Sequence, residues 1–486
     1  MKTLLNIISI YLLMIGSLWT CSNAQAGQLY IGASTISITP NKPVALDGQR
    51  AVRIATKVES PCMATALAIE TRNEESSIEQ AIFVSCDLLE IRGGDNFYES
   101  VRRELTGRIP HDVLGKIILN ATHSHTAPVT VDGKYDLPAS GVMQPSDYQA
   151  FLVKQLGTVI VNAWKNREPA QVAWGLGHAV VAQNRRAVYA DGTAVMYGKT
   201  NQASFRGIEG YEDHGVEILY FWNAKDELIA TAINIACPAQ EASGVAVNAD
   251  FWHPVREALQ KQYGKQLMVL GWGGAGGDQS PRPMYRNAAE ERMRKLRGHD
   301  RLSELARRIV NAWEDVYEVV KPERRNDILF EHRVKTVMLP YRQITGNEYD
   351  QAKEEIVKLE GSNAASAYTL RNWHRRLVNR FEQQQSELPY YDQELHAVRL
   401  GDVAIVTNDF ELFTDYGVQM KSRSPALQTF VLQLCGSGTY LPTQTAVTGG
   451  GYSAVAQSCI VGPEGGQVLV NETLNLLEEL WKRASH

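Results

Sequence analysis

The stretch Lys116-Ile117-Ile118-Leu119-Asn120-Ala121-Thr122-His123-Ser124-His125 runs from an apolar segment directly into a pair of histidines. The apolar part predicts a buried β-strand, and the polar part predicts the loop that follows it. Because side chains alternate across an extended chain, we expect His123 and His125 to project to the same side. Neutral imidazoles at a strand end suit a zinc ion; two half-buried histidines bonded to the backbone are the structural alternative.

Apolar segments of strand character recur along the chain and alternate with helical patterns. The predicted strands are 81–85, 116–119, 216–221, 266–270 and 403–406, and the predicted helices are about 146–165, 252–263, 300–317, 346–359, 366–385 and 468–484. This alternation predicts an α/β (mixed α+β) fold in one large domain over residues 27–486. The charge-rich stretch 284–385 is predicted to be a helical excursion, which could be a solvated surface or shape a substrate entrance.

The first 26 residues have the pattern of a secretory signal, with Lys2, an apolar run over 4–18 and the small-x-small site Ala24-Gln25-Ala26. We therefore expect a periplasmic or secreted protein. Lipid attachment at Cys21 is the less favoured alternative, because the bulky Trp19 precedes it. No later segment offers about 18 consecutive apolar residues, so no stable membrane span is expected. The net charge of -5 gives no basic field for nucleic acid.

Two further motifs follow predicted strands. In Gly276-Gly277-Asp278-Gln279-Ser280-Pro281 the glycines allow a close backbone approach and Ser280 could offer its hydroxyl; a turn capped by Asp278 and Ser280 is the alternative. It is not the GxSxG elbow of the α/β-hydrolases. In Asn408-Asp409-Phe410-Glu411-Leu412-Phe413 the Glu411 carboxylate could ligate a metal or cap a helix from about 411. Tyr440 follows further along.

Taken in this order, the three runs resemble the catalytic domain of the neutral/alkaline non-lysosomal ceramidases, which are zinc amidases that hydrolyse N-acyl sphingosine. The resemblance covers residues from about 28 to 484. It implies that His123, Glu411 and Tyr440 bind Zn²⁺ and that His125 is a neighbouring acid/base or substrate contact. It also implies that Ser280 is the nucleophile or positions the attacking water. The run Asn184-Arg185-Arg186 resembles the family's Asn-Arg run, which would place Arg185 beside the reacting carbonyl or the product carboxylate.

The sequence departs from the family pattern at Ala236-Cys237-Pro238-Ala239-Gln240, where the second zinc histidine would stand. We predict that His253 replaces it, with His214 and a Cys237 thiolate as alternatives. Gln279 stands where the family usually has Val. The C-terminal immunoglobulin-like domain of the family is not expected after the last predicted helix.

These observations predict an exported zinc-dependent hydrolase that cleaves an amide (N-acyl) or related bond through a metal-activated water or Ser280. A hydrolase of a glycan or glycoconjugate is one alternative, because Trp252, Trp272 and Tyr452 near the predicted site could stack on a sugar. A non-catalytic secreted binding protein is another, because a zinc histidine is missing. The expected partner is a small-molecule, lipid-like or glycan substrate.

Overall fold

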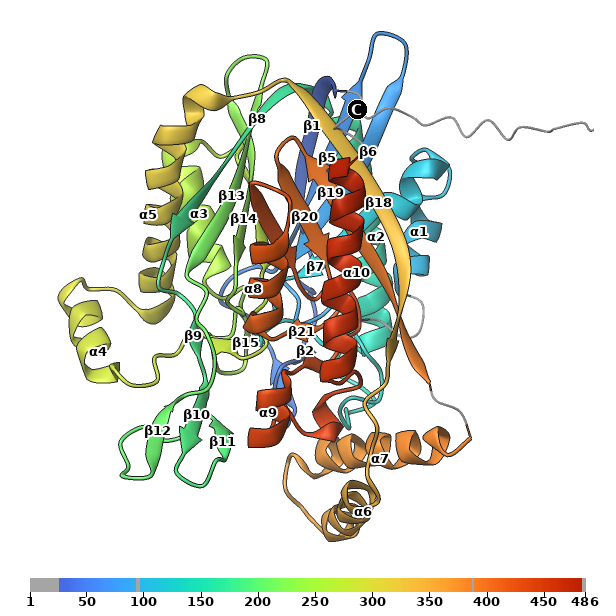
Figure 1. Ribbon diagram of the computed structural model, residues 1–486, viewed down its shortest axis with the longest axis vertical. Helices are drawn as coiled ribbons and strands as arrows, with labels where there is room; N and C mark the ends of the chain where they lie inside the picture. The colour runs from blue at the N-terminus through green and yellow to red at the C-terminus, as the bar shows by residue number, and fades with distance from the viewer. Residues whose placement is uncertain (1–25, 93–96, 387–388, 483–486) are drawn as a thin grey trace, which may run out of the picture.

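The computed structural model describes residues 26–92, 97–386 and 389–482. Within them, a twelve-stranded mixed sheet has the order β16-β14-β13-β8-β1-β18-β19-β20-β22, and β5, β6 and β7 continue from β1 as a branch (Figure 1). Its strands are β1 (Ala26–Ser37), β5 (Met63–Arg72), β6 (Ser77–Cys86), β7 (Ile117–Ala121), β8 (Glu168–His178), β13 (Gly215–Asn223), β14 (Leu228–Ile235), β16 (Met268–Gly273), β18 (Asp327–Pro340), β19 (Tyr390–Leu400), β20 (Val403–Thr407) and β22 (Gln428–Leu432).

The main part of the sheet and its branch both contribute side chains to one apolar core. Phe83 and Ile118 of the branch share this core with Phe221, Trp272 and Phe430 of the main part. Three neighbouring pairs are parallel, namely β6–β7, β14–β16 and β20–β22. Their carboxyl ends are tied together by backbone bonds from Gln433 to Gly273 and from Ala121 to Leu434. The loops after β7, β16 and β20 therefore leave the sheet at one edge.

Helices cover the outer faces of the sheet. The first two pack against the branch, α3 and α5 against the strands around β13, and α8 and α10 against β18–β20 (Figure 1). The helices are α1 (Phe97–Leu105), α2 (Pro145–Lys165), α3 (Trp252–Tyr263), α4 (Asn287–Leu296), α5 (Arg301–Val320), α6 (Gly346–Glu360), α7 (Ala367–Gln384), α8 (Thr414–Arg423), α9 (Gln444–Gly449) and α10 (Pro463–Lys482), with 3₁₀ turns η1 (His111–Lys116), η2 (Lys321–Glu323) and η3 (Ala456–Ser458).

Small elements gather at one end of the molecule, the lower end in Figure 1, where α9, the α6–α7 pair and a three-stranded sheet all lie. The short strands outside the twelve-stranded sheet are β2 (Val44–Leu46), β3 (Arg53–Ala55), β4 (Lys57–Val58), β9 (Gln183–Asn184), β10 (Arg186–Tyr189), β11 (Ala194–Met196), β12 (Phe205–Ile208), β15 (Ala246–Val247), β17 (Gln279–Ser280), β21 (Glu411–Leu412) and β23 (Tyr440–Leu441). Three of the seven residues predicted for the site, Ser280, Glu411 and Tyr440, lie in these short strands.

The mixed α/β fold in one large domain is confirmed, and each predicted strand and helix coincides with an observed one to within a few residues. The helical excursion over 284–385 needs a correction. It contains α4 to α7, but the long strand β18 runs through it and pairs with β1 and β19. Within β18 buried and exposed side chains do not alternate regularly, because Val334, Lys335 and Thr336 are all exposed and buried residues resume at Val337.

The predicted signal over residues 1–26 and Cys21 lie outside the described residues, except for Ala26 at the start of β1. In the described part of the chain, no helix combines the length and apolar character needed to cross a membrane. The cysteines Cys62, Cys86, Cys237, Cys435 and Cys459 are all buried free thiols.

Candidate metal-binding and catalytic site

His123 stands two residues beyond the end of β7 and is almost fully buried. Its Nδ1 lies 2.8 Å from the carbonyl oxygen of Leu89, which leaves Nε2 free to face the site. The expectation of an extended chain is wrong here, because His123 adopts a positive φ of 67°. Such a conformation costs about 1–2 kcal/mol for a residue with a Cβ. The rings of His123 and His125 nevertheless lie close, with centroids 4.9 Å apart.

Glu411 and Tyr440 reach the site on the short parallel pair β21–β23, in which they are direct partners. The Glu411 Oε2 atom lies 3.3 Å from Nε2 of His123. The helix α8 begins only at Thr414, so Glu411 is in a strand and does not cap a helix. The predicted metal ligands His123 and Glu411 therefore meet, although they are far apart in the sequence, and Tyr440 lies beside Glu411.

Arg185 lies between β9 and β10 and joins the loops around this point. Its Nη2 donates to the Gly277 carbonyl at 2.8 Å and to the Tyr440 hydroxyl at 3.2 Å. The same nitrogen is 4.0 Å from Glu411 Oε2. The Arg185 side chain is only 3% exposed. A fixed, buried guanidinium of this kind is suited to stabilise a developing negative charge on oxygen.

The two histidines differ in their electrostatic surroundings. Burial lowers the pKa of His123, but the Glu411 carboxylate outweighs burial, so the pKa is raised overall. Burial, reinforced by the positive charges of His123 and Arg185, holds the pKa of His125 well below its usual range. The Nε2 atom of His125 is buried without a hydrogen-bond partner. His125 is thus a neutral ring with an open nitrogen that can accept a hydrogen bond.

Ser280 is fully buried in β17, which pairs with β9 next to Arg185. Its Oγ accepts a hydrogen bond from the Tyr197 hydroxyl at 3.0 Å and another from the Arg282 amide at 3.2 Å. Arg185 Nη1 in turn donates to the Tyr197 hydroxyl at 3.4 Å. Sequence reasoning missed Tyr197, because it sits in no recognisable motif and comes close only through the β10–β11 turn.

Asp278, the other candidate capping residue of the glycine-rich loop, anchors that loop. Its carboxylate accepts hydrogen bonds from the amide and hydroxyl of Thr414, at 3.0 and 2.8 Å, and from Asn184 Nδ2 at 2.7 Å. These bonds tie the loop to the start of α8 and to β9. Asp278 therefore does not cap its own turn through these bonds but fixes the loop to the elements next to Glu411 and Arg185.

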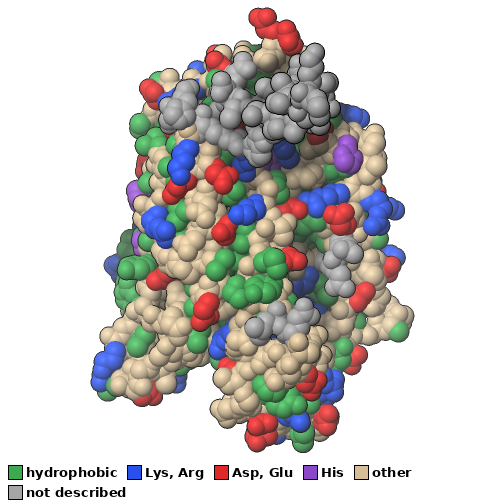
Figure 2. Space-filling model, turned by 45° about the vertical axis from the view of Figure 1, so that its right-hand side comes forward, with side chains coloured by type: hydrophobic (Ala, Val, Ile, Leu, Met, Phe, Trp, Pro, Cys, Tyr) green, Lys and Arg blue, Asp and Glu red, His purple; other side chains and the backbone are tan. Residues whose placement is uncertain are grey.

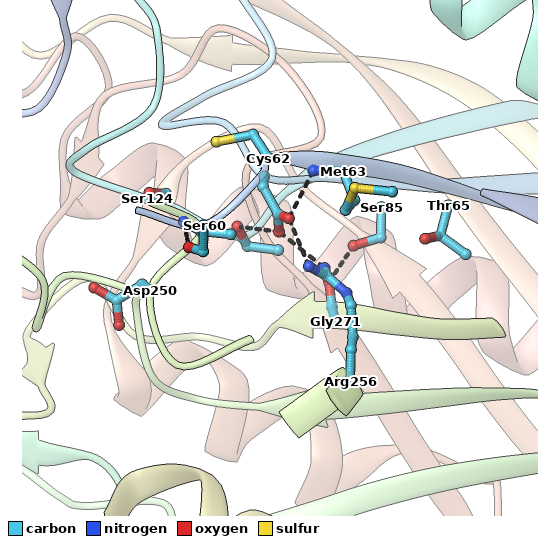
Figure 3. A network of polar contacts seen from close by, with 12 residues as sticks. Ser60, Cys62, Met63, Thr65, Ser85, Ser124, Asp250, Arg256 and Gly271 are labelled. Carbon is cyan, nitrogen blue, oxygen red and sulfur yellow. Dashed lines mark hydrogen bonds and ion pairs between the residues drawn. The ribbon is translucent and has the colours of Figure 1, made fainter. Parts of the chain in front are cut away.

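A buried ion pair supports the His123 loop from behind. The guanidinium of Arg256 on α3 donates to both oxygens of Asp87, at 2.6 and 2.9 Å. Thr122, the neighbour of His123, donates its hydroxyl to the same carboxylate at 3.3 Å. Figure 3 shows Arg256 in this polar network, together with Met63, Ser85 and Gly271. The loop is therefore fixed on its inner side by charge-assisted bonds.

The residues predicted to replace the missing histidine are not brought to this point. His253 lies on α3 and faces Glu257, with Nε2 3.5 Å from that carboxylate. His214 lies 3.4 Å from Glu212 in the same manner. Burial raises the pKa of the Cys237 thiol well above its usual range, which disfavours a thiolate. Across the described ranges, no group of three or more His, Cys, Asp or Glu side chains could hold a metal ion.

The donors present fit a zinc ion with three protein ligands. Neighbouring ligands of a tetrahedral zinc with bonds of about 2.0–2.1 Å lie about 3.3 Å apart. The spacing between His123 Nε2 and Glu411 Oε2 agrees with this value. The bond between His123 Nδ1 and a carbonyl is the arrangement usual for a metal-binding histidine. The Tyr440 phenol interacts with the Glu411 carboxylate and would be the third donor.

Two of the three aromatic residues predicted to stack on a sugar are buried and cannot contact a ligand. Trp252 and Trp272 are both 0% exposed and belong to the core. Tyr452 is partly exposed, and its ring lies 5.8 Å from that of Tyr440. Trp373 of α7, which sequence reasoning did not single out, lies at the same distance on the other side of Tyr452. One of the three predicted stacking residues therefore remains near the site.

Comparison with solved structures shows a fold shared with ceramidases. The neutral ceramidase from Pseudomonas aeruginosa superposes with a TM-score of 0.66 at 15% sequence identity, over 93% of this chain and 75% of that chain. A structure described as ceramidase complexed with C2 gives a TM-score of 0.65 at 13% identity, over 94% and 76%. No protein-family model and no curated protein matches the sequence. At these identities the likeness shows the fold alone.

Proposed function

We propose that this protein is a zinc-dependent hydrolase that cleaves an amide (N-acyl) or related bond. The observation that carries the proposal is the meeting of His123 Nε2 and Glu411 Oε2 at 3.3 Å, with Tyr440 opposite Glu411 in β21–β23. These three side chains come from three separate sequence motifs. Their convergence at the carboxyl ends of sheet strands, beside a buried arginine and a neutral histidine, is the arrangement that a hydrolytic site needs.

In this proposal His123, Glu411 and Tyr440 hold the zinc ion, which when bound supplies Lewis acidity and lowers the pKa of a coordinated water to about 7. Arg185 binds the carbonyl oxygen of the scissile amide and stabilises its charge, because its buried guanidinium is already fixed by Gly277. His125 takes the proton of the attacking water at Nε2 and returns it to the leaving amine.

Ser280 is assigned a positioning role. Its hydroxyl oxygen already accepts two hydrogen bonds, and its side chain is covered by Tyr197. A nucleophile must instead present its oxygen to the substrate carbonyl with a base at hydrogen-bond distance. Ser280 therefore holds the Tyr197 hydroxyl in place, and that hydroxyl supports Arg185.

The test is an activity screen on the purified chain, with matched N-acyl sphingoid, N-acyl amino acid, N-acyl ethanolamine and nitrophenyl ester substrates. We expect hydrolysis of at least one N-acyl substrate, loss of activity after chelation and recovery on adding zinc. Failure to hydrolyse every amide in the zinc-loaded form would refute the proposal. We further propose that the protein acts after export, on the basis of the signal-like pattern in residues 1–26.

A further inference from the structure

Cationic side chains gather around the candidate site, although the chain as a whole carries a net charge of -5. Electrostatic contacts or ion pairs link six cations to the site, namely Arg50, Arg53, Arg92, Lys134, Arg185 and Arg376. Three carboxylates pair with members of this group, namely Asp47, Glu90 and Glu411. Figure 2 shows both signs of charge intermixed over the face that it presents.

Three of these cations, Arg50, Arg53 and Arg376, have no carboxylate within ion-pair distance among the described residues. Arg53 donates instead to the backbone carbonyls of Gly244, Asp47 and His125. Arg50 lies against a pair of neighbouring aromatic rings, with its guanidinium carbon 4.7 Å from the centre of Trp373 and 4.6 Å from that of Tyr452. Arg376 is exposed, and the charged neighbour that affects it most is another cation, Arg92. The guanidinium groups of Arg50 and Arg376 therefore keep donors available for a ligand.

Their position connects them to the proposed zinc ligands. The Tyr452 ring that stacks on Arg50 lies 5.8 Å from the Tyr440 ring. Trp373 and Arg376 are three residues apart on α7, so they share one face of that helix. Arg376 also interacts electrostatically with Tyr452. The face of α7 with Trp373 and Arg376 thus borders the site, next to the aromatic pair that holds Arg50.

We infer that the substrate carries a carboxylate close to the scissile bond, and that Arg50 and Arg376 bind this carboxylate at the entrance. The contact with two aromatic rings restrains the Arg50 guanidinium, and its planar fork matches the two oxygens of a carboxylate. The inference rests on the proposed function, for which it names an N-acyl amino acid as the substrate class. A uronic acid glycoside offers the same carboxylate chemistry on a different scissile bond.

The experiment compares N-acyl glycine with N-acyl ethanolamine of the same acyl chain, because the two differ mainly in the carboxylate. The zinc-loaded wild-type chain is tested beside Arg50→Gln, Arg376→Gln and the double variant. Arg375→Gln is the matched control, since Arg375 is on the same helix and makes an exposed pair with Glu360 at 3.9 Å. Thermal melting of each variant checks that it is folded.

We expect the wild-type kcat/KM to favour the carboxylate substrate by on the order of 10–100-fold, as for a hydrogen bond to a charged group. Arg50→Gln and Arg376→Gln should remove most of this preference, mainly through KM, and Arg375→Gln should keep it. The preference should also shrink with rising salt. Equal turnover of both substrates by the wild-type chain, or an unchanged preference in the double variant, would overturn the inference while leaving the proposed hydrolase intact.

Two further arms separate the inference from the proposed function. Binding of N-acyl glycine, measured by calorimetry, should weaken at least about 10-fold in the double variant, even if no amide is hydrolysed. Turnover of nitrophenyl glucuronide but not nitrophenyl glucoside or any amide would support carboxylate recognition and refute amide hydrolysis. If N-acyl glycine binds no better to the wild-type chain than to the double variant, the carboxylate inference is wrong whatever the activity.

Discussion

Glu411 and Tyr440 are direct partners in the parallel pair β21–β23, and this register sets a carboxylate beside a phenol within reach of His123. The pair is short and cannot be stable alone, so its position depends on the glycine-rich loop packed against it. Gly277 donates its amide to the Leu412 carbonyl at 2.8 Å. The site therefore depends on backbone contacts as much as on its side chains.

Gly277→Ala should damage the site through this contact. A Cβ atom at Gly277 would lie 2.2 Å from the Glu411 carbonyl oxygen, so the backbone of β21 would have to move. We expect a loss of about 1–3 kcal/mol in the free energy of unfolding and weaker zinc binding. Gly346→Ala is the control, because an added Cβ there meets nothing within 4 Å. Denaturant titration and zinc titration measure both effects; equal behaviour of the two variants would contradict this role of Gly277.

Arg256→Met should destabilise the protein strongly, because it leaves the fully buried Asp87 carboxylate without its bidentate partner. Removing one member of a buried pair costs about 3–5 kcal/mol. The double variant Asp87→Asn/Arg256→Met should recover part of that loss, since no uncompensated charge remains. Chemical denaturation of the single and double variants gives the comparison. A single variant within about 0.5 kcal/mol of wild type would show that the pair is not structurally important.

Asp250 predicts a pH dependence of stability. Burial raises its pKa to about 7, despite hydrogen bonds from the amides of Ala242 and Phe251. The folded chain then holds this proton at pH values where the unfolded chain has released it, so stability should fall as pH rises from about 4 to about 7, by at most on the order of 4 kcal/mol. Asp250→Asn should remove this part of the slope. An unchanged slope in Asp250→Asn would contradict the assignment.

Ser280→Ala and Tyr197→Phe should lower kcat by similar factors, on the order of 10–100-fold, because both break the same hydrogen bond. If Ser280 only positions Tyr197, the double variant should be no slower than either single one. Steady-state kinetics on an N-acyl substrate tests this coupling. Mass spectrometry tests the alternative role of Ser280. An acyl group trapped on Ser280 would identify it as the nucleophile and contradict the positioning role.

The sequence predicted much of the fold because apolar periodicity is local. The segments around Val84, Ile118 and Ile405 fold as strands as expected, since their side chains are buried on both faces. The strand β18 was missed because three consecutive exposed residues, 334–336, interrupt the alternation of buried and exposed side chains that indicates a strand. The motifs that resemble those of ceramidases indicated that His123, Glu411, Tyr440 and Arg185 would be neighbours, and in the structure these residues do lie close together.

The remainder of the site depends on contacts between distant segments. Tyr197, Arg50 and Trp373 approach the site only through tertiary packing, and no spacing in the sequence indicates them. The positive φ of His123 likewise follows from the bonds of its loop to Leu88 and Leu89. His253 was a plausible ligand by residue type, but in the structure it pairs with Glu257 one turn further along α3.

The most direct test of the account is the zinc content of purified variants, measured by mass spectrometry together with amide hydrolysis. The wild-type chain should hold one zinc ion per chain, and His123→Ala and Glu411→Gln should lose both zinc and activity. His253→Ala should keep both, because His253 lies beside Glu257, apart from the other proposed ligands. If His123→Ala retained stoichiometric zinc, the meeting of His123 and Glu411 would not be the metal site and the central claim would be wrong.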